Sequence, residues 1–276
     1  MKNNKHLGIK LWIILSGLIV IGLVLFIISF IFSKGLSSIS FNFIFDRPKG
    51  MPLGMKGGVF PAIVGSFYFT LIASCFASFI AIAVAVYIKF YCNNEKISTL
   101  VHVVVQSIAG IPSIILGLFG YTFLVVYLKL GISLLAGGLT LGIMIFPFIE
   151  VRIEKIIDEV DEGIINSSYA LGMSKSYTFL KLILPICLSD MLGTIALAAG
   201  LAMGAAAPII FTGGVVNAPV PKDILSPAMA LPYHLYILIG EGISIDKAYE
   251  TACVLLFLLI LLNIIVIFID VFRRVE

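Results

Sequence analysis

The sequence predicts an all-α integral membrane protein with six transmembrane helices. Hydrophobic residues make up 61% of the 276 residues and charged residues only 12%, whereas an ordinary soluble domain is about 25% charged. The apolar residues gather in uncharged runs that are long enough to cross roughly 30 Å of hydrocarbon as helices. The net charge of +3 is weak and the basic residues lie at the ends of these runs, so nothing indicates nucleic-acid binding.

The first apolar run, 11–32, follows Lys2, Lys5 and Lys10. It is longer than the roughly 7–15 apolar residues of a signal peptide, and no A-x-A cleavage site follows it. We therefore expect a retained transmembrane helix rather than a cleaved signal. Uncharged runs of sufficient length define all six expected helices. They lie near residues 10–32, 60–88, 98–128, 134–151, 184–211 and 251–270.

Two of the expected helices contain residues that bend or break a helix. The third contains Gly110–Ser113 (GIPS), and the fifth ends in Gly204–Pro208 (GAAAP). Proline removes a backbone donor and kinks a helix, and in a membrane the freed carbonyl group needs another partner. Small residues let a second helix approach closely. Two interpretations stay open, namely kinked helix packing and bends that line a pathway.

The basic residues favour an orientation with both termini in the cytoplasm. With the N-terminus inside, eleven Lys and Arg residues lie inside and seven lie outside. The segment 33–55 carries most of the outside charge. The inside residues are Lys2, Lys5, Lys10, Lys89, Lys96, Arg152, Lys155, Lys175, Lys181, Arg273 and Arg274, and the outside residues are Lys34, Arg47, Lys49, Lys56, Lys129, Lys222 and Lys247.

Isolated polar residues do not form a recognisable catalytic or metal site. His234 lies in the outside segment 213–249 without a second ligand at metal-binding spacing, so we expect a surface or packing residue. Intramembrane acids are functional candidates, but Asp190 lies near a helix end and is expected to be hydrated or paired. The cysteines form no CxxC pair and are expected to be small apolar packing residues. They are Cys75, Cys92, Cys187 and Cys253.

The segment 152–183 differs from its surroundings because it is polar, charged and helical in pattern. Its apolar residues recur at helical spacing with charged residues on the other face, which predicts an amphipathic helix. Gly163 suits the end of this helix, and Asn166 suits the N-cap of a short helix that ends at Gly172. Ser174 can cap the helix that returns to the membrane. The apolar positions are Ile153, Ile156, Ile157, Val160 and Ile164.

A short helix with an apolar stripe suits a groove on a partner protein. The alternative is an interfacial helix that touches only lipid headgroups. The acidic face of the segment argues against that alternative, because the cytoplasmic leaflet is itself negatively charged. The pattern therefore favours a protein partner for this segment.

The spacing at the end of this segment resembles a known docking loop. Gly172 is followed by nine residues and then by Leu182–Pro185 (LILP). This resembles the EAA-x3-G-x9-I-x-LP pattern with which the permeases of ABC importers dock their cytoplasmic ATPase. The resemblance implies that the ATPase-docking residues are Asn166, Ser167, Ser168, Ala170, Leu171, Gly172, Leu182 and Pro185.

Five segments in the same order resemble the PstA-type permease of phosphate ABC importers. Residues 57–66 (GGVFPAIVGS) resemble its GGI-x-PAIVGT motif, and residues 110–120 (GIPSIILGLFG) resemble its GVPSIVYGLFG motif. Residues 168–172 (SYALG) resemble its S-x-ALG motif, residues 204–208 lie where it has GETAP, and residues 226–236 contain its LP-x-H-x-Y pattern. The resemblance implies a type I, MetI-like permease fold over 57–276, preceded by a transmembrane helix and outside loop in 1–56.

The sequence departs from the family pattern at two places. Residues 166–168 read NSS instead of EAA, although Asn is also a good cap. The family carries Arg at the position of Leu201 and Glu at that of Ala205, and an arginine there can bind phosphate with two charge-assisted hydrogen bonds. No buried cation is expected in any span. The residues expected along the translocation path are Pro112, Ser113, Leu201, Gly204, Ala205, Ala206 and Pro208.

These observations predict the permease subunit of an ATP-driven importer in the cell (plasma or inner) membrane of a prokaryote. The chain has no G-x4-GK[ST] loop, so no cofactor is expected on it and ATP and Mg²⁺ would bind a partner ATPase. The resemblance implies a PstC-type sister permease, a PstB-type ATPase dimer and a PstS-type binding protein as partners, besides membrane lipid. Phosphate is the expected substrate, and a different substrate is the alternative.

Two other function classes have less support. A secondary transporter or channel would carry coupling acids or rings of charge within the spans, and only Asp190 is expected to fit. An intramembrane enzyme would need a nucleophile and a base, or metal ligands, placed together. His102 has no obvious partner for such a site and is expected at a helix end.

Overall fold

The computed structural model describes the backbone of residues 3–36, 38–51 and 54–273, and the side chains of 8–36, 38–51, 54–265 and 268. The described part is helical apart from one small antiparallel hairpin, in which β1 (Pro48–Lys49) pairs with β2 (Lys56–Gly57). The helices, with π-helical segments named η, are α1 Asn3–Gly35, α2 Phe41–Phe45, α3 Phe60–Val86, η1 Tyr87–Tyr91, α4 Glu95–Ala109, α5 Ser113–Gly120, η2 Tyr121–Tyr127, α6 Leu134–Asp158, α7 Glu162–Ala170, α8 Lys175–Thr178, η3 Phe179–Ile183, α9 Leu184–Gly204, α10 Ile209–Thr212, α11 Leu231–Gly240 and α12 Ile245–Arg273.

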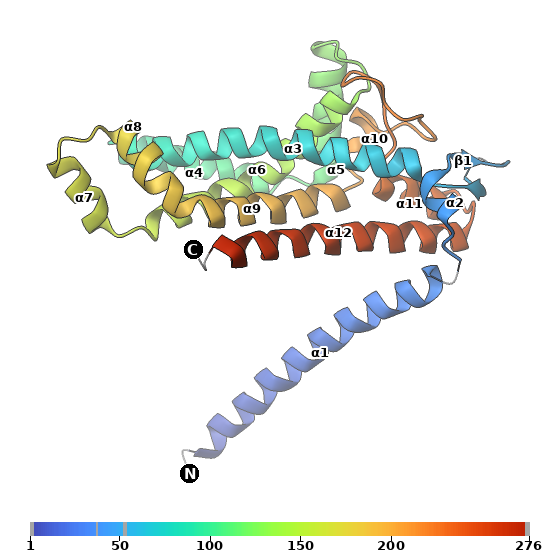
Figure 1. Ribbon diagram of the computed structural model, residues 1–276, viewed down its shortest axis with the longest axis horizontal. Coiled ribbons are helices and arrows are strands. Elements are labelled where there is room, and N and C mark those ends of the chain that lie inside the picture. The colour runs from blue at the N-terminus through green and yellow to red at the C-terminus, as the bar shows by residue number, and fades with distance from the viewer. Residues whose placement is uncertain (1–2, 37, 52–53, 274–276) are drawn as a thin grey trace.

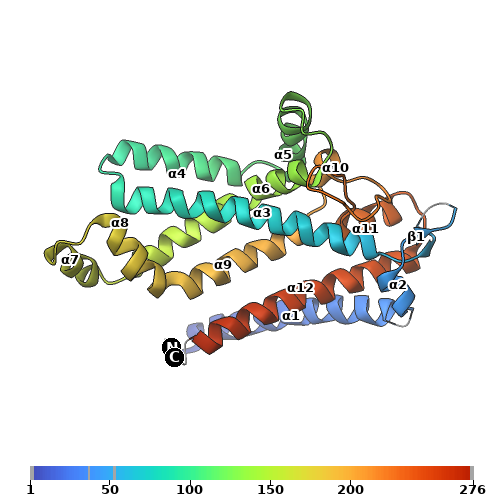
Figure 2. The same ribbon diagram turned by 45° about the horizontal axis from the view of Figure 1, so that its top comes forward.

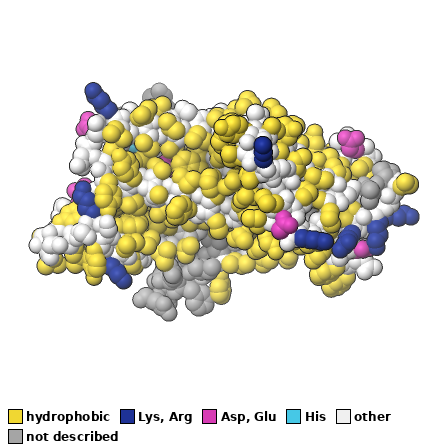
Figure 3. All heavy atoms as spheres, turned by 90° about the horizontal axis from the view of Figure 1, so that it is seen from above, with side chains coloured by type: hydrophobic (Ala, Val, Ile, Leu, Met, Phe, Trp, Pro, Cys, Tyr) yellow, Lys and Arg dark blue, Asp and Glu magenta, His cyan; other side chains and the backbone are white. Residues whose placement is uncertain are grey.

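The long helices α3, α6, α9 and α12 run along the long axis of the molecule (Figure 1). One end of this bundle carries α7 and α8, and we call it the loop end. The opposite end carries α2, the β1–β2 hairpin and α11, and we call it the hairpin end. Helix α4 packs against α6 on the loop-end half of the bundle (Figure 2). Viewed from above, charged side chains gather toward the two ends, and the middle is mostly apolar (Figure 3).

The predicted all-α fold is confirmed, and the number of spans is six when the bent pair of α4 and α5 is taken as one span. Five described helices are long and apolar enough to cross a membrane, and the sixth span is the pair α4 and α5, which is bent by 99°. Gly110 caps the end of α4, and Pro112 precedes the first residue of α5. The third helix, predicted as one element over 98–128, is therefore two helices joined at the GIPS segment.

Other boundaries also differ from the prediction. Helix α6 continues to Asp158 rather than ending at 151. The fifth helix, predicted over 184–211, begins in the continuous helix from Lys175 and breaks after Gly204. Ala205 is extended, with φ −89° and ψ 122°, and Pro208 lacks the N–H that would bond to the carbonyl group of residue 204. The helix therefore cannot continue through this segment.

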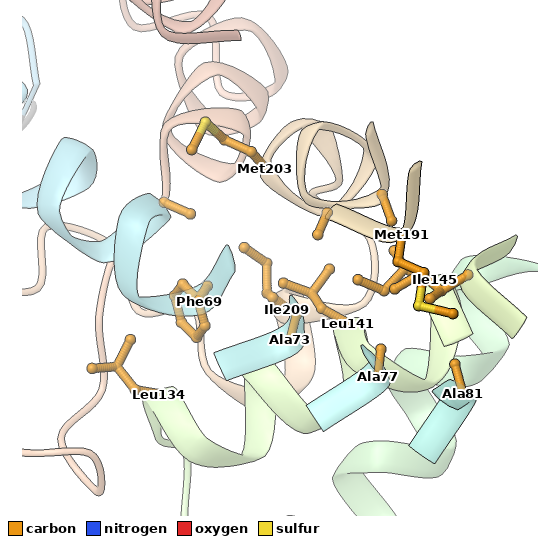
Figure 4. Packing of buried hydrophobic residues seen from close by; sticks show 14 of the residues in the cluster. Phe69, Ala73, Ala77, Ala81, Leu134, Leu141, Ile145, Met191, Met203 and Ile209 are labelled. Atoms are coloured by element: carbon orange, nitrogen blue, oxygen red, sulfur yellow. The ribbon is translucent and has the colours of Figure 1, made fainter. Parts of the chain in front are cut away.

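The centre of the bundle is the contact between α3 and α6, where small residues allow close packing. Alanines of α3 recur every four residues on the face toward α6, and all of them are buried. On α6, Gly142 lies so close to α3 that an added Cβ would be 3.1 Å from the carbonyl oxygen of Ala73. Leu141 and Ile145 of α6 and Met191 and Met203 of α9 complete this core (Figure 4). The alanines are Ala73, Ala77, Ala81 and Ala85.

The hairpin end is held by close approaches of backbone. Gly65 of α3 lies against the carbonyl oxygen of Met229, and the amide of Leu231 donates a 2.7 Å hydrogen bond to the Ser66 hydroxyl. Gly117 of α5 lies near the carbonyl oxygen of Ala207, 3.0 Å from where a Cβ would stand. All glycines of the 57–66 and 110–120 motifs except Gly110 are thus positions where another segment of the chain approaches too closely for a side chain.

Helix α1 contrasts with the bundle. None of its most apolar 18-residue window is buried, and it diverges from α12 toward its N-terminus (Figure 1). Its contacts are near its C-terminal end, where Phe30 packs edge-on against Tyr249 and Gly35 lies against the backbone of Tyr249. Lipid or another protein must therefore cover most of this helix in a membrane.

Candidate coupling loop and translocation path

The loop end consists of two short helices joined by a tight turn. Asp161 caps α7 by accepting a 2.7 Å hydrogen bond from the amide of Gly163, and Ser174 caps α8. Gly172 lies between them with φ +80°, a backbone conformation that favours glycine. The predicted turn at Gly172 and the cap at Ser174 agree with this geometry. The roles predicted for Gly163 and Asn166 were wrong, because α7 begins before both of them.

Most of the apolar stripe of this segment was misinterpreted as a partner-binding face, since Val160 is buried like the three isoleucines of α6 and only Ile164, on α7, is exposed. Ile153, Ile156 and Ile157 belong to α6 and are buried in the core of this chain. The Cys187 thiol on α9 lies 3.8 Å from the carbonyl oxygen of Ile156, so the neighbouring helix covers that stripe. An apolar face at helical spacing can pack against another helix of the same chain as well as against a partner protein. The spacing identifies the face but not what covers it.

Other apolar side chains at the loop end face outward. Leu171 is 77% exposed at the tip between α7 and α8. Tyr177 and Leu180 are also exposed on the following helix. Only Leu171 among these three was expected from the docking pattern. Tyr177 and Leu180 fall within the nine residues after Gly172, which the pattern leaves unspecified, so no sequence signal identified them.

The predicted docking residues fall into two groups. The larger group surrounds α7 and its turn, where the Ser168 hydroxyl lies 3.0 Å from the Thr178 hydroxyl and joins α7 to α8. The smaller group lies where the chain returns to the bundle, with Leu182 half-buried in η3 and Pro185 exposed in the first turn of α9. The remaining residues of the first group are exposed, and they are Asn166, Ser167, Ala170, Leu171 and Gly172.

Polar contacts connect the loop to the end of α3. The Lys175 ammonium donates a 2.6 Å hydrogen bond to the Phe90 carbonyl oxygen, and the hydroxyls of Tyr91 and Ser176 are 2.7 Å apart. Lys89 of η1 forms ion pairs with Asp158 at 2.7 Å and Glu154 at 3.2 Å. These contacts join α8 to η1, and η1 to α6.

A polar cavity of about 370 Å³ separates α7 from the end of the bundle. The side chains of α6 and α7 do not fill the space between the two helices. Its lining residues come from η1, from the end of α6 and from α7, and they include Lys89, Asp158, Glu162, Asn166 and Tyr169.

The residues predicted along the path gather around the break after α9. Gly204 and Ala206 line an open hollow of about 370 Å³ together with Pro232 and Tyr236 of α11. Leu201 is 53% exposed one turn before this hollow. The structure thus brings the 204–208 segment and the LP-x-H-x-Y segment together, although about 25 residues of chain separate them.

The other predicted path residues lie away from this hollow. Pro208 is buried, and its backbone packs against Gly117 of α5. Ala205 is half-buried at the break, Pro112 is exposed and Ser113 is half-buried at the α4–α5 bend. No Arg or Lys side chain lines the hollow among the residues that the structure describes. The hollow by itself offers no cation to an anionic substrate.

The sequence analysis missed two buried acids: Glu250 of α12, which pairs with Lys247 at 2.7 Å, and Glu150. Glu150 lies in α6 one turn before Glu154 and is fully buried, whereas Asp190 is exposed on α9. Asp190 was expected to be hydrated or paired near a helix end, and its exposure agrees with that expectation, but it is not the only acid within the predicted spans. Lys89 also lies inside the apolar helix Phe60–Tyr91 and is only 26% exposed, so a partly buried cation does exist near the loop end. His234 is buried in α11, consistent with a packing residue.

A helical bundle with one sharply bent span and a pair of short helices projecting from one end is the fold of a multi-pass membrane protein. The family described as binding-protein-dependent transport system inner membrane component matches residues 77–274. The chain belongs to this family. It is the permease subunit of an ABC importer, and the ATPase is a separate subunit.

Individual relatives agree with this assignment. The chain is 25% identical to the probable ABC transporter permease protein YqgI of Bacillus subtilis over 84% of this chain and 82% of that protein. It is 28% identical to phosphate transport system permease protein PstA 2 of Mycobacterium tuberculosis over 76% of this chain and 70% of that protein. A solved structure of the MetNI methionine ABC transporter matches 77% of this chain and 93% of its own chain with a TM-score of 0.64 and 22% identity. That likeness confirms the predicted MetI-like fold.

Proposed function

We propose that this permease carries inorganic phosphate and lets it pass beside the break after α9. The observation that supports the proposal is the meeting of the PstA-like segments at one place. Gly204 and Ala206 share a hollow with Pro232 and Tyr236, and the GIPS-containing segment packs against Ala207 through Gly117. A relative named for phosphate transport matches most of the chain.

Phosphate needs positive or hydrogen-bonding groups that this hollow does not supply from Arg or Lys within the described residues. Charge-assisted bonds from arginine are the strongest way to hold a phosphate. We therefore assign these groups to a PstC-type sister permease that faces the hollow, with backbone amides as a further source. In this arrangement Leu201 and Ala205 form the neutral side of a path whose charged side belongs to the partner.

The proposal places the loop end in the cytoplasm, where an ATPase dimer of the PstB type would contact α7 and α8. The beginning of α1 and the end of α12 both point toward that end (Figure 2), which agrees with two cytoplasmic termini. When the ATPases approach each other, α8 would pull on η1 through Lys175 and Tyr91. The bundle would then alternate between outward and inward access as a rigid-body movement.

The hairpin end would face a PstS-type binding protein outside the cell membrane. This end presents the β1–β2 hairpin, α2 and α11 next to the hollow. A substrate released there would reach Tyr236 and Gly204 without crossing the core between α3 and α6. The exposed α1 offers a further apolar surface to lipid or to the sister permease.

The substrate is tested with the complete importer in proteoliposomes. Phosphate uptake that requires ATP and the binding protein is expected, with sulfate and molybdate as competing oxyanions that do not replace phosphate. Uptake of another solute and no phosphate would show a permease for a different substrate. Leu201 and Ala205 are uncharged where the PstA-type pattern has Arg and Glu, and this difference favours that alternative.

The position of the path is tested by cysteine labelling. Leu201→Cys should react with a small water-soluble thiol reagent during turnover, because this side chain is 53% exposed beside the hollow. Ala198→Cys is the matched control on the same helix, since Ala198 is completely buried. Equal inertness of the two variants during ATP-driven transport would place the path elsewhere.

A further inference from the structure

Three carboxyl groups form a ladder along one face of α6. Glu150, Glu154 and Asp158 are spaced by four residues, which places them above one another on a helix. Their exposure rises steadily toward the loop end, from complete burial of Glu150 to side chains that are 13% exposed at Glu154 and 53% exposed at Asp158. The ladder thus leads from the interior of the bundle to the solvent at the loop end.

The two outer carboxylates have partners. Lys89 pairs with both of them, at 3.2 Å from a Glu154 oxygen and 2.7 Å from an Asp158 oxygen. His102 of α4 places its Nδ1 atom 3.6 Å from the other Glu154 oxygen. Glu154 therefore joins α6 to both η1 and α4, and its negative charge is compensated.

The innermost carboxyl group differs from the other two. Neither Glu150 oxygen has a hydrogen-bond partner among the described residues. The charges that act on Glu150 are those of Glu154 and Lys89, which oppose each other. On α9, which also packs against α6, Cys187 contacts the Ile156 carbonyl oxygen and Asp190 is exposed. Burial of an ionised carboxylate without donors costs several kcal/mol, so this environment suits a neutral carboxylic acid.

We propose that Glu150 is a proton-binding site that communicates with the loop-end solvent along the Glu154–Asp158 face of α6. Glu150 binds one proton on a carboxylate oxygen, and the proton comes from the water at the loop end. The site goes beyond phosphate transport, because it makes the permease responsive to pH on one side of the membrane whatever solute it carries.

The ladder also indicates what release of the proton does. An ionised Glu150 would stand one turn from Glu154 and compete with Glu154 and Asp158 for the ammonium group of Lys89. Lys89 would then be drawn toward the interior and away from Asp158, the last residue of α6. Because α7 follows α6 directly, loss of the proton weakens the connection between the bundle and the loop end.

The direct test is infrared spectroscopy of the complete importer in lipid at neutral pH. The wild-type protein should show the carbonyl stretching band of a protonated carboxylic acid, and Glu150→Gln should abolish it. Glu154→Gln is the matched control one turn away and should retain the band. A wild-type spectrum without such a band, or a band that survives in Glu150→Gln, would overturn the proposal.

A second measurement separates this site from the question of the substrate. Raising the pH should remove the band from the wild-type protein in one titration step, which needs neither a variant nor a transported solute. In the same liposomes the pH dependence of basal ATP hydrolysis should be lost in Glu150→Gln. Failure of phosphate uptake with an intact, titrating band would refute the proposed substrate and leave the proton site standing, whereas absence of the titration would refute the site alone.

Discussion

The two ends of the bundle are held together by different means. At the hairpin end, close backbone approaches dominate, as where Gly65 lies against the Met229 carbonyl group, and they are joined by the Ser66–Leu231 hydrogen bond and by the Lys247 ammonium over the Phe43 ring. At the loop end, flexible charged side chains make the connections, as in the pairs of Lys89 with Glu154 and Asp158. Close backbone contacts do not slide easily, whereas ion pairs and side-chain hydrogen bonds can be exchanged.

This difference suits the work of an importer that receives its energy at one end. Under the proposed function, the loop end follows the ATPase without unfolding, and the pocket between α7 and η1 is the space available for that movement. The hairpin end must keep its shape so that small movements of α3 are transmitted to the hollow at Gly204. The comparison predicts that substitutions at the hairpin end affect folding and those at the loop end affect coupling.

The largest effect is expected for Gly65→Ala at the hairpin end. The new Cβ would overlap the carbonyl oxygen of Met229, so backbone has to move, and overpacking of this kind costs about 1–3 kcal/mol or more. Thermal unfolding of the purified chain measures the loss. Gly193→Ala is the control, since nothing lies within 4 Å of a Cβ there; equal stability of the two variants would contradict the close-contact interpretation.

The second largest effect is expected for Lys89→Met at the loop end. It leaves Glu154 and Asp158 without their shared cation in a partly buried position, and we expect a loss of about 1–2 kcal/mol, below the value for a fully buried pair. Lys49→Met breaks the exposed pair with Asp46 at the hairpin end and should cost less than about 1 kcal/mol. A larger loss of stability for Lys49→Met than for Lys89→Met would contradict the comparison of the two ends.

Gly172→Val should act on coupling more than on stability. A β-branched residue is strained at φ +80°, by roughly 1–2 kcal/mol, but the site is open and nothing lies near a Cβ. ATP hydrolysis should therefore continue while uptake falls. Gly172→Asn is the control, because Asn tolerates this conformation; normal uptake in both variants would mean that the turn geometry is unimportant for coupling.

Tyr91→Phe should have a small effect of about 0.5–1 kcal/mol. It removes the 2.7 Å hydrogen bond between the Tyr91 and Ser176 hydroxyls at an exposed position. A double-mutant cycle with Ser176→Ala isolates the interaction. Additive effects of the two substitutions on unfolding and on coupled uptake would show that this contact does not join α8 to η1.

The smallest effect is expected at low pH and comes from the carboxylate of Asp46 at the hairpin end. The side-chain hydrogen bond from Lys49, followed by the backbone hydrogen bond from Arg47, lowers the pKa of Asp46 below its ordinary value of 3.8. A lowered pKa contributes stability above the ordinary value, and this contribution is lost as the pH falls through the lowered one. The unfolding temperatures of wild type and Asp46→Asn should therefore differ slightly at neutral pH and converge in acid. A constant difference would show that the charge of Asp46 is unimportant.

The number and order of the spans could be predicted from the sequence, because uncharged runs report directly on hydrocarbon thickness. The GIPS and GAAAP segments also indicated a bend and a break, because proline interrupts the hydrogen bonds of a helix locally. The angle between α4 and α5 could not be predicted, because it depends on what Gly117 and Gly120 pack against.

The candidate site was harder to predict, for reasons visible in particular residues. Ile153 and Ile156 show the same spacing whether a partner or the next helix covers them. Gly163 follows an acidic pair, and this sequence fits the end of one helix or the first turn of another. Glu150 lies at the end of an apolar run, and only the packing of α6 determines that it lies in the interior rather than at the surface.

Helix α1 contributes little to the packing of the bundle, yet its presence has a consequence for biogenesis. The family match begins at residue 77, so α1 lies outside it. Removing one crossing from a chain that crosses six times would move the new N-terminus to the opposite side of the membrane from α12's end. The first apolar helix usually sets the orientation in which a chain is inserted. We therefore expect the least packed helix to set the side of the membrane on which the 152–183 segment lies.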